Sequence, residues 1–347
     1  MHQVNNPKTS VKNTTIHDVA DKAGVTIGTV SHVINGTAPI SEETSAKVFQ
    51  AVKELGYKPN SFARSLRRKQ SKMIGLLVPD LVEFYNSISR KIMDHAYDNG
   101  YSVMLLSYQY SLEREKREID VLMEHQVDAI ALFGGVNDEG MLESIMEAGT
   151  PVILCDRRIK SESFSSIEFD NEDAMRQVVR HLKGKGYKSL GYISEPLEVI
   201  NIIDRFSGFK IGAFEQGYEV DDNNVFFCES LKLDKMKNGY DFMKSLLEQR
   251  PAANLPKVFV TTSDMIAIGV IGALNEAGYR VPEDFGVVGF DDLLISPFIS
   301  PPLTTVAQDS WVMAKVVWDT ISDTLEKKIA KPVNLKLSNK IVVRDSC

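Results

Sequence analysis

Residues 15–37 read TIHDVADKAGVTIGTVSHVINGT, a stretch dense in helix start and stop signals. Thr15 followed by Asp18 forms a T-x-x-D capping box, in which each side chain accepts a hydrogen bond from the backbone N–H of the other residue. This pattern predicts a helix over residues 16–23. Gly24 tolerates a positive φ angle and therefore predicts the end of that helix.

Two more helices are predicted after short turns. Thr26 is the expected cap of a helix over residues 27–35, which ends at Gly36. Ser41, followed by two glutamates, predicts the start of a third helix, which ends before Gly56. The apolar face of the second helix consists of Ile27, Val30, Val33 and Ile34. Two helices joined by a tight turn with glycine are typical of the helix-turn-helix, whose second helix enters the major groove of DNA.

The polar face of the second helix favours DNA recognition over a purely structural role. It carries short polar side chains that can reach bases or phosphates, and no acidic residue. These residues are Thr29, Ser31, His32 and Asn35. A solvated helix face usually mixes Glu with Lys. A structural three-helix bundle is the alternative, and DNA recognition is the better interpretation.

The charge of the chain changes sign along its length. Residues 1–73 hold 11 Lys and Arg against 5 Asp and Glu, and the remaining residues hold 29 against 42, so a head of +6 precedes a body of −13. Such a head suits a polyanion, which the acidic body repels. Six of the basic residues lie from Lys58 to Lys72, where a solvated basic linker is an equally good interpretation from charge alone.

Residues 59–72 form the expected connection between head and body. Pro59-Asn60-Ser61 predicts a helix of about two turns, which is too short to be stable without a partner copy or DNA. Leu66, which lies among arginines, would then enter the minor groove as a wedge between base steps. An amphipathic linker that packs on the body is the alternative, and the local sequence does not decide between them.

From Met73 onward, short apolar runs alternate with helical patterns, which predicts an α/β core of two doubly wound lobes. The expected strands are residues 73–79, 102–107, 127–133, 151–155, 189–194, 224–227, 257–262 and 286–290. The expected helices are residues 84–99, 112–125, 138–148, 172–184, 206–217, 235–249, 265–277 and 311–328. Strands near residues 334–343 would complete either lobe.

Open α/β sheets bind ligands beyond the carboxyl ends of their strands. Four aspartates lie at or just past such ends: Asp80, Asp156, Asp264 and Asp291. For each of them, capping or a turn is the alternative. Arg205 is predicted to begin a helix, where a cation opposes the helix dipole and requires a partner. A guanidinium that faces carboxylates suits a polyhydroxylated ligand such as a sugar, and a surface ion pair with Asp204 is the alternative.

Several classes of protein are excluded. Cys155, Cys228 and Cys347 are scattered and form no CxxC pair, which argues against a disulfide framework or a zinc site. The N-terminus is polar, and no run approaches the about 18 apolar residues that span a bilayer, so we expect a cytoplasmic protein without membrane contact. No catalytic or phosphate-binding motif is present, and we expect no enzymatic activity, no metal and no cofactor.

Seven motifs, in order, resemble the lactose repressor and galactose repressor family over residues 15–347. They are the stretch quoted above, ELGYKPNSFARSL, IGLLVPD, DRFSGF, SDMIAIG, VVGFDD and PPLTTVAQD. The resemblance implies a helix-turn-helix domain over residues 15–58, a hinge helix with linker over residues 59–72, and a core like periplasmic sugar-binding proteins over residues 73–347. It also implies a homodimer or larger assembly on double-stranded operator DNA.

The resemblance implies DNA contacts in the head and in the hinge, with Leu66 in the minor groove. The implied DNA-binding residues are Thr15, Ile16, His17, Thr26, Ile27, Gly28, Thr29, Ser31, His32, Asn35, Asn60, Ala63, Arg64, Leu66 and Arg67. His32 stands where many relatives have arginine, and Gly28 has no side chain where others place a base reader. The operator sequence therefore does not follow from the resemblance.

The resemblance also implies an effector site between the lobes. The implied effector-binding residues are Asp80, Phe84, Asp156, Arg205, Ser263, Asp264 and Asp291. One lobe would comprise residues 73–169 with 309–337, and the other residues 170–308 with 338–347. The chain would cross between them near Phe169, Gln308 and Leu337. Residues 1–14 have no counterpart, and we expect them to be disordered.

These observations predict a sequence-specific transcriptional regulator, a repressor, that binds its operator as a dimer. A small-molecule effector, a sugar, would bind between the lobes and control operator binding. A regulator controlled by a protein co-effector is one alternative. A sugar-binding protein or an enzyme with an accessory DNA-binding head is another, and turnover of a bound sugar would identify the enzyme.

Overall fold

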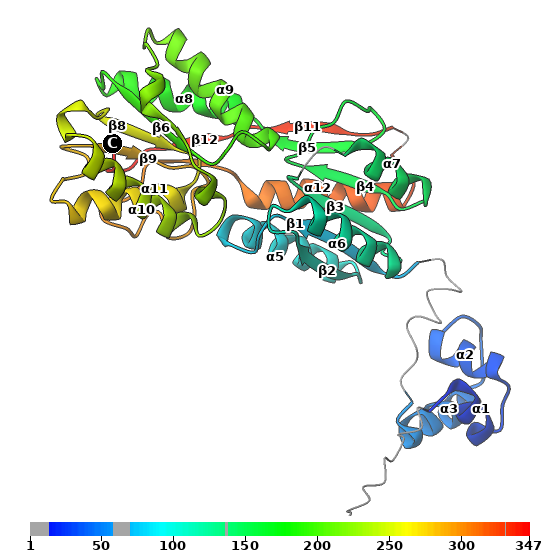
Figure 1. Cartoon of the computed structure of the whole chain (residues 1–347). Helices are drawn as coiled ribbons and strands as arrows, with labels where there is room; N and C mark the ends of the chain where they lie inside the picture. The colour runs from blue at the N-terminus through cyan, green and yellow to red at the C-terminus, as the bar shows by residue number, and fades with distance from the viewer. Residues whose placement is uncertain (1–13, 58–69, 136–137, 330) are drawn as a thin grey trace, which may run out of the picture. The chain divides into compact units, whose positions relative to one another are not determined.

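The computed structural model describes residues 14–57, 70–135, 138–329 and 331–347 (Figure 1). The chain divides into two compact units, Met1–Ser71 and Lys72–Cys347, each with its own hydrophobic core. The expected hinge helix lies outside the described residues. So does the expected disordered tail, except for Thr14, whose hydroxyl donates to the carbonyl oxygen of Leu55 at 3.0 Å. The third helix therefore holds the last residue of that tail in place.

The head contains its three predicted helices: α1 (Ile16–Ala23), α2 (Ile27–Asn35) and α3 (Glu42–Leu55). Thr15 and Asp18 form the predicted capping box at the start of α1. The backbone N–H of Thr29 donates to the Thr26 hydroxyl at the start of α2, and Ser41 caps α3 in the same way. Each helix ends at a glycine in the left-handed conformation. The predicted capping signals are confirmed.

A small core holds the three helices of the head together. Val19, Val30 and Val48, one from each helix, are fully buried. Ile27, which the sequence assigns to the same apolar face as Val30, is instead 39% exposed. Ile27 is the first residue of α2, at the end of that face. This end of the apolar face is therefore exposed.

The first lobe of the body is built on a six-stranded parallel sheet with the order β11-β5-β4-β3-β1-β2. The strands are β1 (Met73–Val78), β2 (Ser102–Ser107), β3 (Ala129–Phe133), β4 (Val152–Cys155), β5 (Ser165–Phe169) and β11 (Asn334–Leu337). One core cluster joins the sheet to two helices, α5 (Glu83–Asp98) and α12 (Ser310–Leu325). A second cluster joins it to α6 (Leu112–Glu124) and α7 (Glu139–Glu147).

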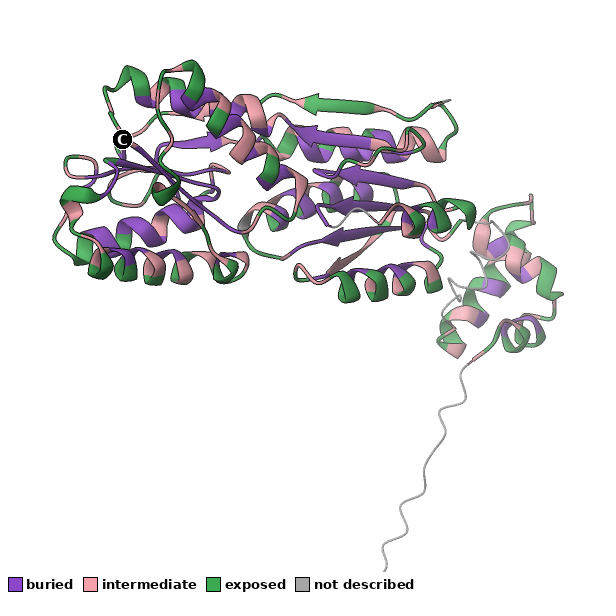
Figure 2. Ribbon diagram, turned by 45° about the horizontal axis from the view of Figure 1, so that its top comes forward, coloured by how far each residue is buried: buried purple, intermediate pink, exposed green. Residues whose placement is uncertain are grey.

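The second lobe is built on a four-stranded parallel sheet with the order β7-β6-β8-β9. The strands are β6 (Leu190–Ser194), β7 (Val225–Phe227), β8 (Val258–Thr261) and β9 (Gly286–Val288). Two core clusters join this sheet to helix pairs: α8 (Asn171–Gly184) with α9 (Ile200–Glu215), and α10 (Lys235–Gln249) with α11 (Asp264–Glu276). Figure 2 shows the central strands of both sheets buried, whereas the edge strand β11 is exposed. Short 3-10 helices are η1 (Asp222–Asn224), η2 (Glu229–Lys232) and η3 (Ala252–Asn254).

The predicted alternation of strands and helices is confirmed, but two strands were missed. The strand β5 begins with two serines, so it lacks the apolar run that marks its neighbours. The strand β10 (Thr305–Ala307) has only three residues. The strands predicted near residues 334–343 are β11 in the first sheet and β12 (Lys340–Val342), which pairs antiparallel with β10. The two missed strands form by pairing with strands distant in the sequence, which local sequence does not encode.

The chain passes between the lobes at three points. The strands β5 and β11 belong to the first sheet, whereas the segments that follow them, α8 and β12, pack together in the second lobe. In the reverse direction, β10 contributes Val306 to the core of the second lobe, and α12 then packs on the first. Three adjacent connections of this kind permit a hinge motion of the two lobes.

A close approach of backbones positions the start of α10. A Cβ atom on Gly269 of α11 would lie 2.1 Å from the carbonyl oxygen of Met236 in α10. Only glycine therefore lets these two helices pack at this distance. Because Met236 is the second residue of α10, the contact also places Lys235 at the edge of the second lobe.

Candidate functional site

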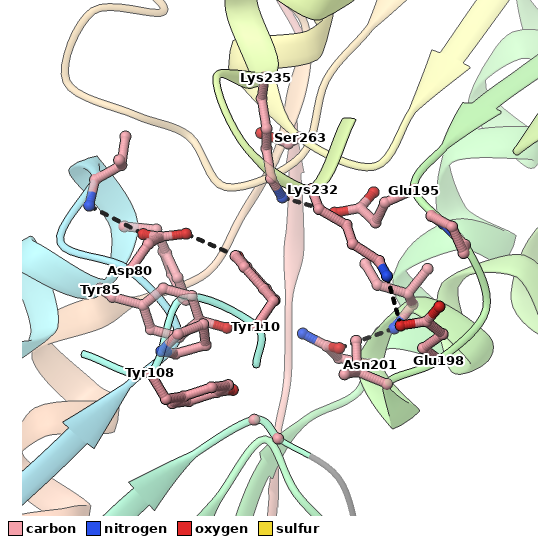
Figure 3. A pocket seen from close by; sticks show the side chains of 18 of the residues that line it. Asp80, Tyr85, Tyr108, Tyr110, Glu195, Glu198, Asn201, Lys232, Lys235 and Ser263 are labelled. Atoms are coloured by element: carbon pink, nitrogen blue, oxygen red, sulfur yellow. Dashed lines mark hydrogen bonds and ion pairs between the residues drawn. The ribbon is translucent and has the colours of Figure 1, made fainter. Parts of the chain in front are cut away.

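A cavity lies between the two lobes of the body, beyond the carboxyl ends of their strands (Figure 3). It has an empty volume of about 990 Å³, part of which is open to solvent. The lining residues of the first lobe follow β1, β2 and β3, and those of the second lobe follow β6 and β9 or begin α9, α10 and α11. The predicted location of the site at strand ends agrees with this geometry.

Arg205 is the most constrained cation of the cavity. Its Nε donates to Asn171 at 2.9 Å, its Nη1 to the carbonyl oxygen of Thr262 at 2.6 Å, and its Nη2 to Gln308 at 3.3 Å. The guanidinium also lies over the ring of Phe290, with 3.8 Å between its carbon and the ring centroid. These contacts fix the orientation of the guanidinium group and leave two of its five N–H donors for a ligand.

The prediction that Arg205 begins a helix is wrong. The helix α9 starts at Ile200, so Arg205 lies in its second turn and does not oppose the first backbone N–H groups. The run Ile200-Asn201-Ile202-Ile203 has a low local helix propensity, which explains the misplaced start. Burial of Ile202 in the lobe overrides that propensity.

The four predicted aspartates do not all reach the cavity. Asp80 and Asp291 line it, together with Phe84, Arg205 and Ser263. Asp156 and Asp264 are 1% and 0% exposed and are not in the cavity wall, which contradicts the prediction that all four open toward one crevice. Both are engaged in internal hydrogen bonds: Asp156 accepts from the backbone N–H of Phe169, and Asp264 from Leu293, Ser296 and Thr305. They brace the connections around the cavity.

The carboxyl group of Asp291 titrates in a pH range that can be measured. Burial raises the pKa of its carboxyl group to about 8, although Arg205, 3.9 Å away, acts to lower it. The folded chain therefore keeps a proton on Asp291 near neutral pH, which the unfolded chain, with an ordinary pKa of about 4, releases. Since the folded state binds more protons, the free energy of unfolding must fall as pH rises toward 8.

We expect Asp291→Asn to flatten this pH dependence. Burial raises the pKa of Asp156 and Asp264 only to about 6, so these two carboxyl groups contribute little to the slope between pH values of about 6.5 and 8.5. Comparison with Asp291→Asn removes the contribution of the histidines, which both proteins share. Melting temperatures of the wild-type chain should decline across that window, and those of Asp291→Asn should decline less. An equally steep decline in both proteins would contradict the assigned burial of the Asp291 carboxylate.

The first lobe presents aromatic rings to the cavity. Tyr85, Tyr108 and Tyr110 line it, and the Tyr110 hydroxyl donates to Asp80 at 2.7 Å. Tyr108 donates to the carbonyl oxygen of Phe133 at 3.1 Å. No motif in the sequence marks these tyrosines as functional. Only their position indicates a role, because Tyr108 and Tyr110 follow the end of β2, as Asp80 follows the end of β1.

The second lobe contributes an ion pair that the sequence analysis missed. The ammonium group of Lys235 lies 2.6 Å from Glu195, and the Thr262 hydroxyl donates to the other oxygen of that carboxylate. Although burial acts to raise it, the Lys235 ammonium holds the pKa of Glu195 below its usual value. Glu195 directly follows β6, so the rule that selected Asp80 also selects Glu195. Lys235 carries no comparable local signal.

The predicted DNA-binding residues of the head surround the start of α1 and the first two turns of α2. Thr15, His17, Thr26, Ile27, Gly28 and His32 are exposed, and Ile16, Thr29, Ser31 and Asn35 are partly buried. The hydroxyls of Thr26 and Thr29 lie 3.0 Å apart, and His32 Nδ1 lies 2.9 Å from the Thr37 hydroxyl. The predicted DNA contacts of the hinge lie outside the described residues: Asn60, Ala63, Arg64, Leu66 and Arg67.

The described part of the chain contains no group of three or more His, Cys, Asp or Glu side chains placed to hold a metal ion. In the same residues, no helix is both long and apolar enough to cross a membrane.

Comparison with known proteins relates both units to one family. Residues 15–60 match the model of bacterial regulatory proteins of the lacI family, and residues 179–347 match a periplasmic binding protein-like domain. The chain is 33% identical to the HTH-type transcriptional regulator RegA of Clostridium saccharobutylicum, over 96% of this chain and 99% of that protein. It is 31% identical to the ribose operon repressor of Halalkalibacterium halodurans, over 96% of this chain and 97% of the repressor.

Solved structures agree with this assignment. The lac repressor bound to ONPG in its repressed state matches with a TM-score of 0.83 and 26% identity, over 97% of this chain and 100% of that one. The complex of the transcriptional regulator CelR with cellobiose matches with a TM-score of 0.71 and 27% identity, over 96% of this chain and 100% of that one. The relatives are transcriptional regulators and not enzymes. The chain belongs to the lacI family of bacterial regulatory proteins, and it is a DNA-binding transcriptional regulator.

Proposed function

We propose that this regulator is a cytoplasmic repressor that binds a pseudo-palindromic operator as a dimer and responds to a polyhydroxylated small molecule, a sugar, between its lobes. The observation that carries the proposal is that Arg205 and Asp291 lie 3.9 Å apart in one wall of the cavity, which is also lined by aromatic rings of the opposite lobe. The N–H donors of a guanidinium, a carboxyl group and aromatic ring faces are groups that can bind a sugar. Relatives described with ribose control and cellobiose support this choice.

The proposed mechanism couples the lobes to the hinge. Because the cavity is lined by both lobes, an effector that contacts both walls favours one relative angle of the lobes over another. In a dimer, that angle sets the separation of the two hinge segments and hence their ability to form on DNA. Arg158 of the first lobe lies 2.7 Å from Asp204 of α9, the residue before Arg205. Because this ion pair joins the two lobes, its distance depends on their relative angle.

A loop of the second lobe supports the proposed dimer. After β9, Leu294 and Phe298 are 86% and 78% exposed, and Ile295 beside them is 44% exposed. Adjacent apolar side chains of this size are rarely left in water in a monomer. We propose that a second copy of this chain covers them, as expected for a regulator whose fold matches that of a lac repressor dimer bound to its operator.

The experiment that tests the function selects DNA from random duplexes with the purified chain and then measures binding to the selected site. A half-site repeat and a dimer-to-site stoichiometry are expected. A panel of sugars should contain at least one that changes operator affinity. A chain that prefers no sequence over random duplex would contradict the proposal.

We expect Leu66→Ala to weaken binding to the selected operator by about tenfold or more and binding to random duplex far less. The wedge assigned to Leu66 by resemblance acts only where the DNA is bent at a specific site. Leu81→Ala, which changes a leucine of the body that is 52% exposed, is the matched control and should leave both affinities unchanged. Fluorescence anisotropy on the two duplexes measures the difference, and equal losses would refute the wedge.

A further inference from the structure

The ammonium group of Lys235 occupies a defined position in the cavity wall. Its side chain is 21% exposed and that of Glu195 is 7% exposed, so the pair is largely removed from water. Glu195 accepts a hydrogen bond from one of the three N–H groups of the ammonium. The described residues provide no second hydrogen-bond partner for this ammonium group. Across the cavity, the ring centroid of Tyr110 lies 6.0 Å away. Figure 3 shows Lys235 reaching from the second lobe toward the residues of the first.

Two other cations of the second lobe also have unused donors. Arg205 uses three of its five N–H groups on Asn171, Thr262 and Gln308. Lys232 donates to Glu198 at 2.7 Å and to Glu229 at 2.6 Å, which leaves one donor. The wall of the second lobe therefore offers several charge-assisted donors to one ligand.

The wall of the second lobe carries charges of both signs. Its cations are Arg205, Lys232 and Lys235, and its carboxyl groups are Glu195, Glu198 and Asp291, while Asp80 and Glu115 line the opposite wall. Lys232 is paired with Glu198 and Lys235 with Glu195. Burial raises the pKa of Asp291 to about 8, so this group adds little negative charge near neutral pH and leaves Arg205 without a full counter-ion. A buried Lys–Glu pair also costs desolvation that two apolar side chains would avoid, which indicates a role in specificity.

Helix starts add to the positive character of the site. Among the described α-helices, α5, α9 and α10 begin without a side-chain cap, and residues at the start of each line the cavity. The other described α-helices begin at a Ser, Thr or Asp cap. Uncapped first turns leave N–H groups and the positive ends of helix dipoles available to a ligand.

We propose that the effector of this regulator carries an oxyanion, a carboxylate or a phosphate, on a polyhydroxylated body, and that Lys235 is the residue that binds this oxyanion. The inference rests on the proposed function of the cavity as the effector site and names the class of ligand that it takes. Glu195 holds Lys235 in position and competes with the ligand for it.

The test uses the full-length chain with inorganic phosphate and with acetate as probes, at constant ionic strength set with chloride. At least one of the two ions should raise the melting temperature of the wild-type chain, and the ion that does so identifies phosphate or carboxylate as the preferred group. Lys235→Met should bind that ion about tenfold more weakly. Lys237→Met, two residues further along α10 with a side chain that is 72% exposed, is the matched control and should keep wild-type affinity.

Glu195→Gln separates ligand binding from a structural role. Removal of the competing carboxylate should strengthen binding of the probe ion severalfold, whereas a purely structural pair predicts weaker binding from either change. The double variant Glu195→Gln/Lys235→Met buries no unpaired charge and should bind as weakly as Lys235→Met alone. Any anion binding by the head is common to all variants and cancels in the comparison.

Three results would overturn the proposal: no effect of either ion on the wild-type chain, equal effects on wild type and Lys235→Met, or weaker binding by Glu195→Gln. The measurement needs no DNA. A chain that binds the ion through Lys235, yet whose operator binding ignores an occupied cavity, would instead contradict the proposed function.

Discussion

Arg205→Ala should weaken effector binding by at least about 100-fold and abolish the response of operator binding to the effector. The reason is that the remaining N–H donors of the guanidinium are aimed by four fixed contacts, and each charge-assisted hydrogen bond to a ligand contributes about 1.5–3 kcal/mol. Two such bonds lost together give a factor of this size. Isothermal titration with a ligand from the sugar panel measures it.

The same change should also lower the stability of the body. Arg205 is 5% exposed, and its removal leaves buried acceptors on Asn171 and Gln308 without their donor. Lys210→Ala, on the exposed side of the same helix, is the matched control and should leave both the melting temperature and the ligand affinity unchanged. If Arg205→Ala responds to the effector like the wild-type chain, Arg205 does not bind it.

Arg157→Met should lower the free energy of unfolding of the body by about 3–5 kcal/mol, because it leaves a buried carboxylate without its counter-ion. Arg157 donates to Glu115, and both side chains are 1% exposed. Gly135 packs against this pair so closely that a Cβ atom would lie 2.7 Å from each partner. The backbone of Gly135 therefore packs directly against both charged groups.

The double variant Glu115→Leu/Arg157→Met should recover most of the stability that Arg157→Met loses, since two apolar side chains avoid the desolvation of both ions. Denaturant unfolding of the three proteins measures the two differences. A single variant as stable as the wild type, or a double variant less stable than the single one, would show that the pair is not the buried, coupled unit described above. Because Glu115 also lines the cavity, effector affinity should fall in both variants.

Local patterns predicted those parts of the fold that local interactions determine. Thr15, Thr26 and Ser41 satisfy backbone N–H groups three residues away, so their helices begin where the sequence places them. The strand β5 could not be found in this way, because Ser166 is buried through pairing with β4 and β11, the latter more than 160 residues away in the chain. Ile200–Glu215 illustrates the same limit, since packing in the lobe extends this helix beyond its local propensity.

The candidate site was predicted in part for a related reason. Strand ends located Asp80 and Asp291 correctly, because parallel strands bring their carboxyl ends to one edge of a sheet. The same argument could not show that Asp264 turns away to bind Ser296 and Thr305, which are distant in sequence. Lys235 reaches the cavity because α10 packs on α11 at Gly269, a contact that no local pattern encodes.

The central claim is that a small molecule between the lobes controls DNA binding by the head, and thermodynamic linkage tests it most directly. Operator affinity is measured with and without the effector, and effector affinity with and without operator DNA. The account predicts that both affinities change by the same factor and that Arg205→Ala removes the change in operator affinity. An operator affinity that stays the same while the effector saturates the wild-type chain would contradict it.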